Sequence, residues 1–374
     1  MLQGTDPRTT TDQLRQDYDV TQIDGIWTVL GHPEAMQVAR DPHSYSSAVS
    51  RYLQLPNGLD GVEHSRFRAL IDRYMTPSVV AGLEPVFAKV AQEVVGEAVA
   101  GTLQGETAEV DAVELGINFS VRAMTAWLGW PRDLEPRLVQ WVRNNSQASR
   151  SRQQEKTAEV AADFDEIIRE VVEPRLRDSS IKDVTADLVK DDFLGRKLTF
   201  EEIVSILRNW TGGDLSSMAL CIGVVVQGLT NNRAVQDRIR GGVSTRELEA
   251  MIDEFLRIDS PFVTNRRVTT CPVTLAGQHI PAGEQININW TSANRDERIF
   301  EDPDAYDAFN LSKNLVWGAG PHECPGRDLS MAELRAFVTA LIDATVVTPT
   351  QSAPVRARFP LGGYVSAPVV LNRI

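Results

Sequence analysis

The chain has 374 residues, of which 42% are hydrophobic and 24% charged, and this profile is typical of a soluble globular protein. Its formal net charge of -13, without a cluster of Lys and Arg, argues against a nucleic-acid partner. The polar N-terminus has no apolar core for a signal peptide, and no uncharged apolar run reaches the ~18 residues that a membrane span needs.

The cysteines and the absence of linkers indicate one intracellular unit. Cys221, Cys271 and Cys324 are odd in number and far apart, so they form no disulfide framework and fit a reducing cytoplasm. No stretch rich in Ser, Gly or Pro divides the sequence. We therefore expect a cytoplasmic chain that forms a single domain over residues 1–374.

The first third of the chain predicts a hairpin followed by helices. Asp24-Gly25 between two runs rich in β-formers is a strong hairpin signal, and His32-Pro33-Glu34 predicts the start of a helix. Residues 44–61 predict a long loop of the kind that is often functional. Apolar residues at three- and four-residue spacing predict helices at 63–74, 77–100, 110–128 and 158–176.

The middle of the chain predicts one long buried helix. Thr199 and Glu202 form a capping-box pattern at its start. Residues 203–229 are apolar nearly all round, except at Thr211-Gly212-Gly213-Asp214, where we expect an interruption. Strand patterns follow at 273–275, 278–280, 285–288 and from residue 346 onward, so the fold class is mainly α with minor β.

The most specific stretch is Trp-Gly-Ala-Gly-Pro-His-Glu-Cys-Pro-Gly at residues 317–326. Its glycines allow backbone angles closed to other residues and a close approach by a flat ligand. Cys324 stands just before a predicted helix at 328–341, whose N-terminus should lower the pKa of the thiol and favour a metal-binding thiolate. The ordinary alternative is a packed, inert cysteine, which would not need the glycines and histidine around it.

This stretch resembles the haem-binding loop of cytochromes P450, Phe-Gly-x-Gly-x-His-x-Cys-x-Gly, with Trp317 in place of the phenylalanine. The resemblance implies haem b (iron protoporphyrin IX), held between a long kinked central helix and the cysteine loop. It implies Cys324 as the axial iron ligand. The other loop residues that it places at the haem are Trp317, Gly318, His322 and Gly326.

Two further motifs resemble structural parts of that family. His64 and Arg68, four residues apart on one helix face, are by default a solvated basic patch, but the resemblance makes them haem-propionate ligands, together with Arg267 and His322. Glu254 and Arg257 are by default a surface ion pair, but they match the E-x-x-R motif that lies buried behind the haem. Asn310 stands where the family has a third, arginine member, so we expect this network to be rewired.

The segment 212–217 resembles the family's oxygen-binding groove, in which an acid and an alcohol relay protons. By default it is a helix kink whose hydroxyls bond back to the preceding turn. Asp214 comes one position early, Leu215 holds the usual place of the acid, and serines replace the threonines. The sequence leaves open whether Ser216 or Ser217 works with Asp214.

The resemblance implies a haem-thiolate monooxygenase that inserts one atom of O2 into a small-to-medium hydrophobic or aromatic substrate, by hydroxylation or oxidative demethylation. The alternatives are a peroxide-driven haem peroxygenase and a non-catalytic haem-binding protein. We expect a monomer that takes electrons from a separate ferredoxin or flavodoxin-type donor with its reductase, docked at Arg66, Arg73 and Arg327. The expected substrate contacts, which could equally be ordinary core, are Leu53, Leu55, Trp210, Phe262, Val263, Thr264 and Leu361.

Overall fold

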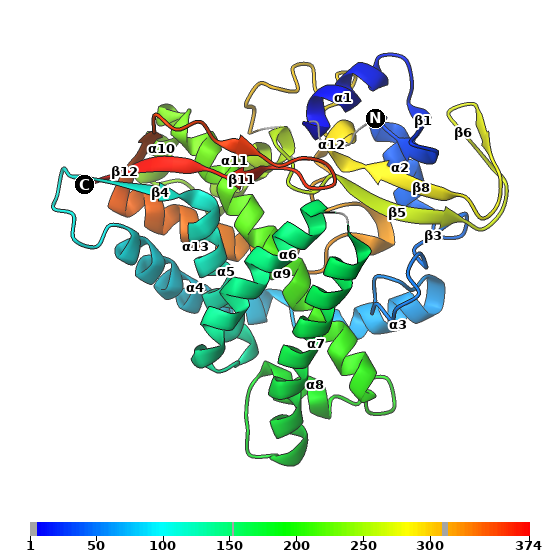
Figure 1. The fold of residues 1–374 in the computed structure, drawn as a ribbon, viewed down its shortest axis with the longest axis horizontal. Helices are drawn as coiled ribbons and strands as arrows, with labels where there is room; N and C mark the ends of the chain where they lie inside the picture. The colour runs from blue at the N-terminus through cyan, green and yellow to red at the C-terminus, as the bar shows by residue number, and fades with distance from the viewer. Residues whose placement is uncertain (1–5, 152, 309–312) are drawn as a thin grey trace.

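The computed structural model describes residues 6–151, 153–308 and 313–374 and is mainly helical with small sheets, as predicted (Figure 1). The longest helix, α9, lies in the middle of the molecule, and the sheet that contains β5 and β8 lies to one side of it. The helices are α1 Pro7–Arg15, α2 His32–Arg40, α3 Gly61–Asp72, α4 Pro77–Ala98, α5 Ala112–Leu128, α6 Glu135–Ser151, α7 Gln154–Arg177, α8 Val184–Lys190, α9 Phe200–Thr230, α10 Arg233–Arg240, α11 Thr245–Ile258, α12 Trp290–Ala293 and α13 Arg327–Ala344.

Within the described residues the strands form one five-stranded sheet in the order β1-β2-β8-β5-β3, one three-stranded sheet in the order β4-β12-β9, and two hairpins, β6-β7 and β10-β11. The predicted first hairpin is confirmed, with Asp24 and Gly25 at positive φ in its turn. The strands are β1 Val20–Ile23, β2 Ile26–Val29, β3 Tyr45–Ser46, β4 Thr107–Asp111, β5 Thr264–Thr269, β6 Val273–Leu275, β7 Gln278–Ile280, β8 Gln285–Asn289, β9 Thr345–Pro349, β10 Val355–Arg356, β11 Tyr364–Ser366 and β12 Pro368–Arg373.

Helix α9 forms the centre of the main hydrophobic core. The predicted capping box is present, because Thr199 and Glu202 each accept a hydrogen bond from the other's backbone N–H. The predicted interruption is wrong: the helix continues through Gly212, Gly213 and Asp214. The two glycines cost the helix about 1 kcal/mol each relative to alanine, and packing of the flanking apolar turns offsets this cost.

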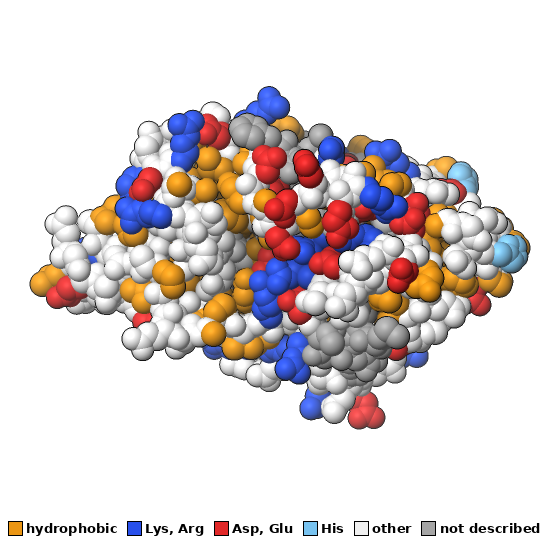
Figure 2. All heavy atoms as spheres, turned by 90° about the horizontal axis from the view of Figure 1, so that it is seen from above, with side chains coloured by type: hydrophobic (Ala, Val, Ile, Leu, Met, Phe, Trp, Pro, Cys, Tyr) orange, Lys and Arg blue, Asp and Glu red, His pale blue; other side chains and the backbone are white. Residues whose placement is uncertain are grey.

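Helix α9 is long and apolar enough to cross a membrane, but 67% of its most apolar window is buried inside the protein, as in the core helix of a soluble protein. Its neighbours include α5, α7, α11 and α13. On the face drawn in Figure 2, acidic side chains are interleaved with Lys and Arg side chains, so this face offers no continuous basic surface for a nucleic acid.

Candidate active site

The cysteine loop folds back on itself at the start of α13. Gly318 and Gly320 have φ of +76° and +72°, and a Cβ at Gly320 would collide with the backbone of Ala39. The N–H of Cys324 donates to the carbonyl of Trp317 at 2.8 Å, which closes the loop. Cys324 is therefore presented at the junction between loop and helix, as the sequence predicted.

The pKa of the Cys324 thiol is raised rather than lowered in this structure. Burial is the largest cause, and the backbone N–H of Gly326 and the nearby charge of Arg68 only partly oppose it. The expectation of a thiol whose pKa is lowered was therefore wrong, because loss of hydration outweighs the opposing effects of the Gly326 N–H and of Arg68.

Trp317 is anchored to the helix α11. Its indole Nε1 donates to Oδ1 of Asp253 at 2.8 Å, and both residues are buried. Burial raises the pKa of Asp253, while Trp317 and Arg327 lower it. Phenylalanine at position 317 could not make this hydrogen bond. The substitution therefore ties the cysteine loop to α11.

A cluster of cationic and imidazole side chains lies beside the loop. The rings of His64 and His322 lie 4.1 Å apart between centroids, and Nε2 of His322 is 3.0 Å from Oγ of Ser47 and 3.5 Å from Oδ1 of Asp60. Burial, and then the charges of His64 and Arg267, lower the pKa of His322 to about 4. Burial also lowers the pKa of His64.

Arg267 is the member of this cluster whose surroundings most clearly favour an anionic ligand. The residue is 6% exposed, its Nη1 donates to the carbonyl of Arg266, and it forms no ion pair within the described residues. Burial lowers the pKa of this guanidinium. A buried cation without a counter-charge is costly, so a carboxylate-bearing ligand fits here.

Arg68 has a different position from the other three predicted propionate ligands. Its guanidinium donates to the carbonyls of Pro321 and Glu323 at 3.2 and 2.8 Å and to Asp72 at 2.7 Å. It therefore supports the backbone of the cysteine loop. A thiol at a helix start, glycines in the loop and an unpaired buried arginine together suit haem b with its propionates.

The acid of α9 faces the helix that follows the cysteine. Asp214 lies near Glu333 of α13, which is fully buried, and beside Ser330. Burial raises the pKa of Asp214 to about 7, and burial together with the charge of Asp214 raises the pKa of Glu333. Three buried carboxyl oxygens have no hydrogen-bond partner among the described residues, and these are Oδ2 of Asp214 and both oxygens of Glu333.

Glu333 was missed by the sequence analysis. The available signal was a single acid in the mostly apolar run Leu329 to Leu334, which follows the cysteine loop. An acid at such a position must be buried or must turn the helix outward. The structure buries it against α9, where two carboxyl groups cannot both ionise readily.

The two candidate serines point in different directions. Oγ of Ser216 accepts a hydrogen bond from Nδ2 of Asn145 on α6 at 3.0 Å. Ser217 lies three residues after Asp214 and therefore on the same side of α9. Its hydroxyl forms no hydrogen bond within the described part of the chain. Ser217, and not Ser216, shares the face of the buried acid.

The Glu254–Arg257 pair is buried, in contrast to an ordinary surface ion pair. The two side chains form a bidentate contact with both N–O distances at 2.7 Å, and Arg257 is 0% exposed. Arg257 also donates to the backbone carbonyls of Asn294, Pro303 and Ala305. Asn310, where we expected a rewired contact, lies outside the described residues.

The structure brings together some of the expected substrate contacts. Oγ of Ser205 on α9 donates to the carbonyl of Leu53 at 3.1 Å and accepts from the N–H of Leu55 at 3.0 Å. Phe262 and Leu361 form a β-bridge between distant segments. Of the seven candidates, Leu55, Trp210 and Val263 are buried, Leu53 is exposed, and Phe262, Thr264 and Leu361 are half-buried.

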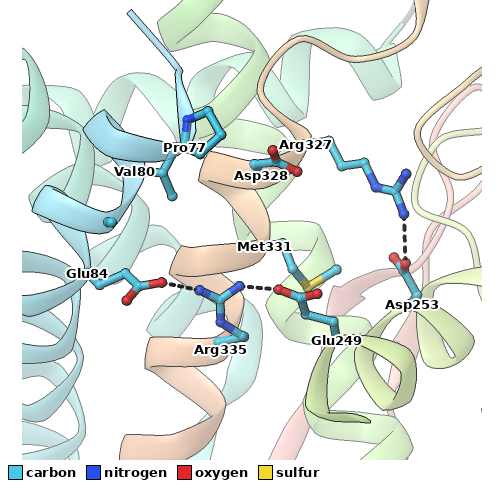
Figure 3. Close-up of a pocket in the computed structure, with 10 residues that line it drawn as sticks. Pro77, Val80, Glu84, Glu249, Asp253, Arg327, Asp328, Met331 and Arg335 are labelled. Atoms are coloured by element: carbon cyan, nitrogen blue, oxygen red, sulfur yellow. Dashed lines mark hydrogen bonds and ion pairs between the residues drawn. The ribbon is translucent and has the colours of Figure 1, made fainter. Parts of the chain in front are cut away.

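Two hollows lie away from the expected substrate contacts. One, of about 340 Å³, lies between α4, α11 and α13, where Arg335 contacts Glu84 and Glu249 and where Arg327 points toward Asp253 (Figure 3). The other, of about 710 Å³, lies beside α3 and is lined by His64, Arg66, Phe193 and His322, among others. Both are next to the cysteine loop, and neither contains Asp214 or Ser217.

Comparison with known proteins gives a consistent result. Residues 131–361 match the family model described as Cytochrome P450. Cyclomarin C epoxidase CymV of Salinispora arenicola is 28% identical over 336 residues, which cover 85% of this chain and 83% of that protein. The methyl-branched lipid omega-hydroxylase of Mycobacterium tuberculosis (strain H37Rv) is 27% identical over 330 residues, which cover 83% of this chain and 76% of that protein.

Solved structures share the fold over nearly the whole chain. A mutant of P450 EryK in complex with erythromycin B superposes with a TM-score of 0.85 at 23% identity, covering 97% of this chain and 95% of that one. Substrate-free CYP109E1 from Bacillus megaterium superposes with a TM-score of 0.84 at 22% identity, covering 98% and 99%.

Proposed function

Because this chain belongs to the cytochrome P450 family, and is a monooxygenase with haem b as its cofactor, we propose that it oxygenates a small-to-medium hydrophobic substrate, with Cys324 as the axial ligand. The observation that carries this proposal is the loop that presents Cys324 at the start of α13. Haem with a thiolate ligand supplies oxygen activation, because the thiolate favours O–O cleavage.

The residues around the loop bind and orient the cofactor. Arg267, His64 and His322 would hold the propionates, and Arg267 would gain the counter-charge that it lacks within the described residues. Arg68 holds the carbonyls of Pro321 and Glu323 and so keeps the loop in place. Trp317, Gly318 and Gly326 would contact the cofactor.

Asp214 and Ser217 move protons on the α9 side, with Glu333 behind them. A carboxyl group with a pKa near 7 can both give and take a proton at neutral pH. Glu333, whose pKa is raised by burial and by Asp214, holds a second proton next to it. Ser216 is held by Asn145 and has a positioning role.

The substrate is a hydrophobic molecule that reaches Leu55, Trp210, Phe262 and Leu361. Three relatives carry names that refer to cyclomarin C, methyl-branched lipids and erythromycin, so related chains act on different compounds. The residues named here are mostly apolar, as in most ligand pockets. Both hydroxylation and oxidative demethylation fit such a pocket.

Electrons come from a separate ferredoxin or flavodoxin-type protein with its reductase. Arg66, Arg73 and Arg327 have side chains that are 51%, 51% and 45% exposed, and each is paired with an acid. The Arg66–Glu63 pair, exposed on both sides, contributes little to stability and can exchange partners on docking, whereas Asp191 and Asp253, which pair with Arg73 and Arg327, are buried. We place the protein in the cytoplasm, as a monomer with one domain over residues 1–374.

The test begins with the reduced protein and carbon monoxide. We expect the Soret band that marks thiolate ligation, and we expect Cys324→Ser to lose it. A spectral screen of hydrophobic compounds then identifies ligands, and product formation is compared between a ferredoxin system and hydrogen peroxide alone. The proposal is wrong if the thiolate-type band is absent or survives the serine variant. Turnover with peroxide alone would favour the peroxygenase.

A further inference from the structure

The indole of Trp317 has a single N–H group, and this group donates to Asp253 and not to the cysteine. Nε1 of Trp317 is 2.8 Å from Oδ1 of Asp253, and both residues are buried. The backbone carbonyl of Trp317 accepts the N–H of Cys324, also at 2.8 Å. Trp317 is therefore bound to α11 through its ring and to Cys324 through its backbone.

The surroundings of Asp253 make it a strong acceptor for this N–H. Its Oδ2 lies 3.6 Å from Arg327, and Figure 3 shows the guanidinium of Arg327 pointing toward it. Burial raises the pKa of Asp253, whereas the contacts with Trp317 and Arg327 both favour the ionised carboxylate. A hydrogen bond to an ionised group is roughly twice as strong as one between neutral groups. Turning the indole N–H toward another acceptor is therefore unfavourable.

The sulfur of Cys324 has no side-chain donor within the described part of the chain. Of the groups that lower the pKa of its thiol, the backbone N–H of Gly326 acts most strongly, followed by the charge of Arg68. In a haem-thiolate site, hydrogen bonds to the sulfur draw electron density away from the iron and raise its reduction potential. An indole N–H in the same loop is a candidate for such a bond if no other acceptor holds it.

We propose that Asp253 is a positioning residue that keeps the N–H of Trp317 away from the sulfur of Cys324. By holding the indole, Asp253 leaves the thiolate with backbone donors alone and keeps the reduction potential of the haem-loaded protein low. The phenylalanine that is usual at position 317 in the family has no N–H and needs no such partner. Asp253 thus allows the loop to carry tryptophan without an added donor to the thiolate. This inference rests on the proposed haem-thiolate function.

The test compares four forms of the haem-loaded protein without substrate: the wild type, Trp317→Phe, Asp253→Leu and the double variant. The carbon monoxide spectrum of the wild type is recorded first, because absence of the thiolate-type band would overturn the proposed function and this inference with it. The reduction potential of each form is then measured by spectroelectrochemistry. Asp253→Asn is the matched control, since its amide oxygen still accepts from the indole although its charge is gone.

We expect Asp253→Leu to have the highest potential of the set, because the indole N–H is then free to donate to the thiolate. Loss of a nearby negative charge also raises the potential, and Asp253→Asn measures this part alone. The double variant has lost the same charge but has no indole N–H, so its potential should lie below that of Asp253→Leu. Trp317→Phe should stay close to the wild type, in which the N–H does not reach the sulfur.

The C–O stretching frequency of the carbon monoxide complex is a second readout. A thiolate that accepts an additional hydrogen bond donates less electron density through the iron, so this frequency should rise in Asp253→Leu. It should stay near the wild-type value in Asp253→Asn. Loosening of the structure alone does not produce this pattern across the four forms. If Asp253→Leu does not bind haem, Asp253→Ala takes its place in the same comparison.

Two results would overturn the proposal while leaving the haem-thiolate function intact. The first is that removing the indole changes the potential by the same amount in the Asp253→Leu background as in the wild type, since the freed N–H would then have no effect on the sulfur. The second is a potential of Trp317→Phe well below that of the wild type, which would mean that the N–H already reaches Cys324 when Asp253 is present.

Discussion

The indole of Trp317 donates a hydrogen bond of 2.8 Å to the buried carboxyl group of Asp253, and this contact joins the cysteine loop to α11. The same helix carries the buried Glu254–Arg257 pair one residue later. The cysteine loop is thus held by a buried hydrogen bond to α11. Arg327, the first residue of α13, approaches Asp253 at 3.6 Å from the hollow in Figure 3.

Trp317→Phe introduces the residue that is usual at this position in the family, yet we expect it to destabilise this chain. Asp253 would lose its buried donor, and an unsatisfied buried polar group costs about 1–3 kcal/mol. Urea unfolding measures the change. The double variant with Asp253→Leu should recover most of the loss, since both polar partners are then absent. Equal stability of Trp317→Phe and wild type would show that the hydrogen bond contributes nothing.

The sequence predicted the features that depend on local chemistry. The Asp24-Gly25 turn, the Thr199 cap and the glycines of the cysteine loop each follow from residues close in sequence, and all three are confirmed. The interruption at Gly212 and Gly213 was wrong because packing along the rest of α9 outweighs the low helix propensity of two glycines.

The contacts that depend on the tertiary structure could not be predicted. Trp317 and Asp253 are 64 residues apart in sequence, and Asp214 meets Glu333 only because α9 and α13 cross. The loss of hydration that raises the pKa of Cys324 is likewise a property of the packed site. The sequence alone indicates which residue types form the site, but it does not indicate which residues they contact.

Asp214→Asn should flatten the pH dependence of stability in weakly acidic solution. The pKa of Asp214 is about 7 in the folded protein, whereas the ordinary value for an aspartate side chain is 3.8. Between these values the folded state binds more protons, so the free energy of unfolding falls as pH rises, by up to ~1.4 kcal/mol per pH unit for one proton. The slope difference between wild type and Asp214→Asn isolates this effect from His322, whose lowered pKa acts in the opposite direction.

Urea unfolding from pH 4 to pH 8 provides this measurement. Asp163→Asn, which changes an exposed acid on α7, is the matched control and should keep the wild-type slope. Glu333 should still contribute part of the slope in Asp214→Asn, since burial alone raises its pKa. Parallel curves for the wild type and Asp214→Asn would mean that Asp214 does not bind an extra proton on folding.

Ser217→Ala should impair proton delivery more than Ser216→Ala. Ser217 shares the face of Asp214, whereas Ser216 is held by Asn145 on α6. Positioned proton transfer typically contributes 10²–10⁴-fold, so we expect product per NADH consumed to fall by at least about tenfold in Ser217→Ala, with hydrogen peroxide released instead. The measurement compares NADH, product and peroxide for both variants. A larger effect in Ser216→Ala would reverse the assignment.

Arg267→Met should have opposite effects on the haem-free and the haem-loaded protein. A buried cation without a counter-charge is unfavourable, so methionine should stabilise the haem-free chain by about 1–4 kcal/mol. The loaded protein should lose haem faster, because a propionate ligand is missing. Unfolding of the haem-free chain and haem transfer to apomyoglobin measure the two effects. Arg266→Met, at the exposed neighbouring position, should change neither.

Arg66→Glu should slow reduction by the electron-donor protein. Arg66 is half-exposed at the hollow beside α3, and its exposed partner Glu63, at 3.1 Å, holds it only weakly. An acidic donor would be steered to this arginine, so reversing its charge should lower the reduction rate by about tenfold at low ionic strength and weaken its salt dependence. Arg73 is less suitable, because its reversal would repel Asp191.

Stopped-flow reduction over a range of salt concentrations measures the effect of Arg66→Glu. Arg177→Glu, an equally large charge change on α7, is the control. If Arg66→Glu and Arg177→Glu behave alike, only net charge matters and docking does not involve Arg66.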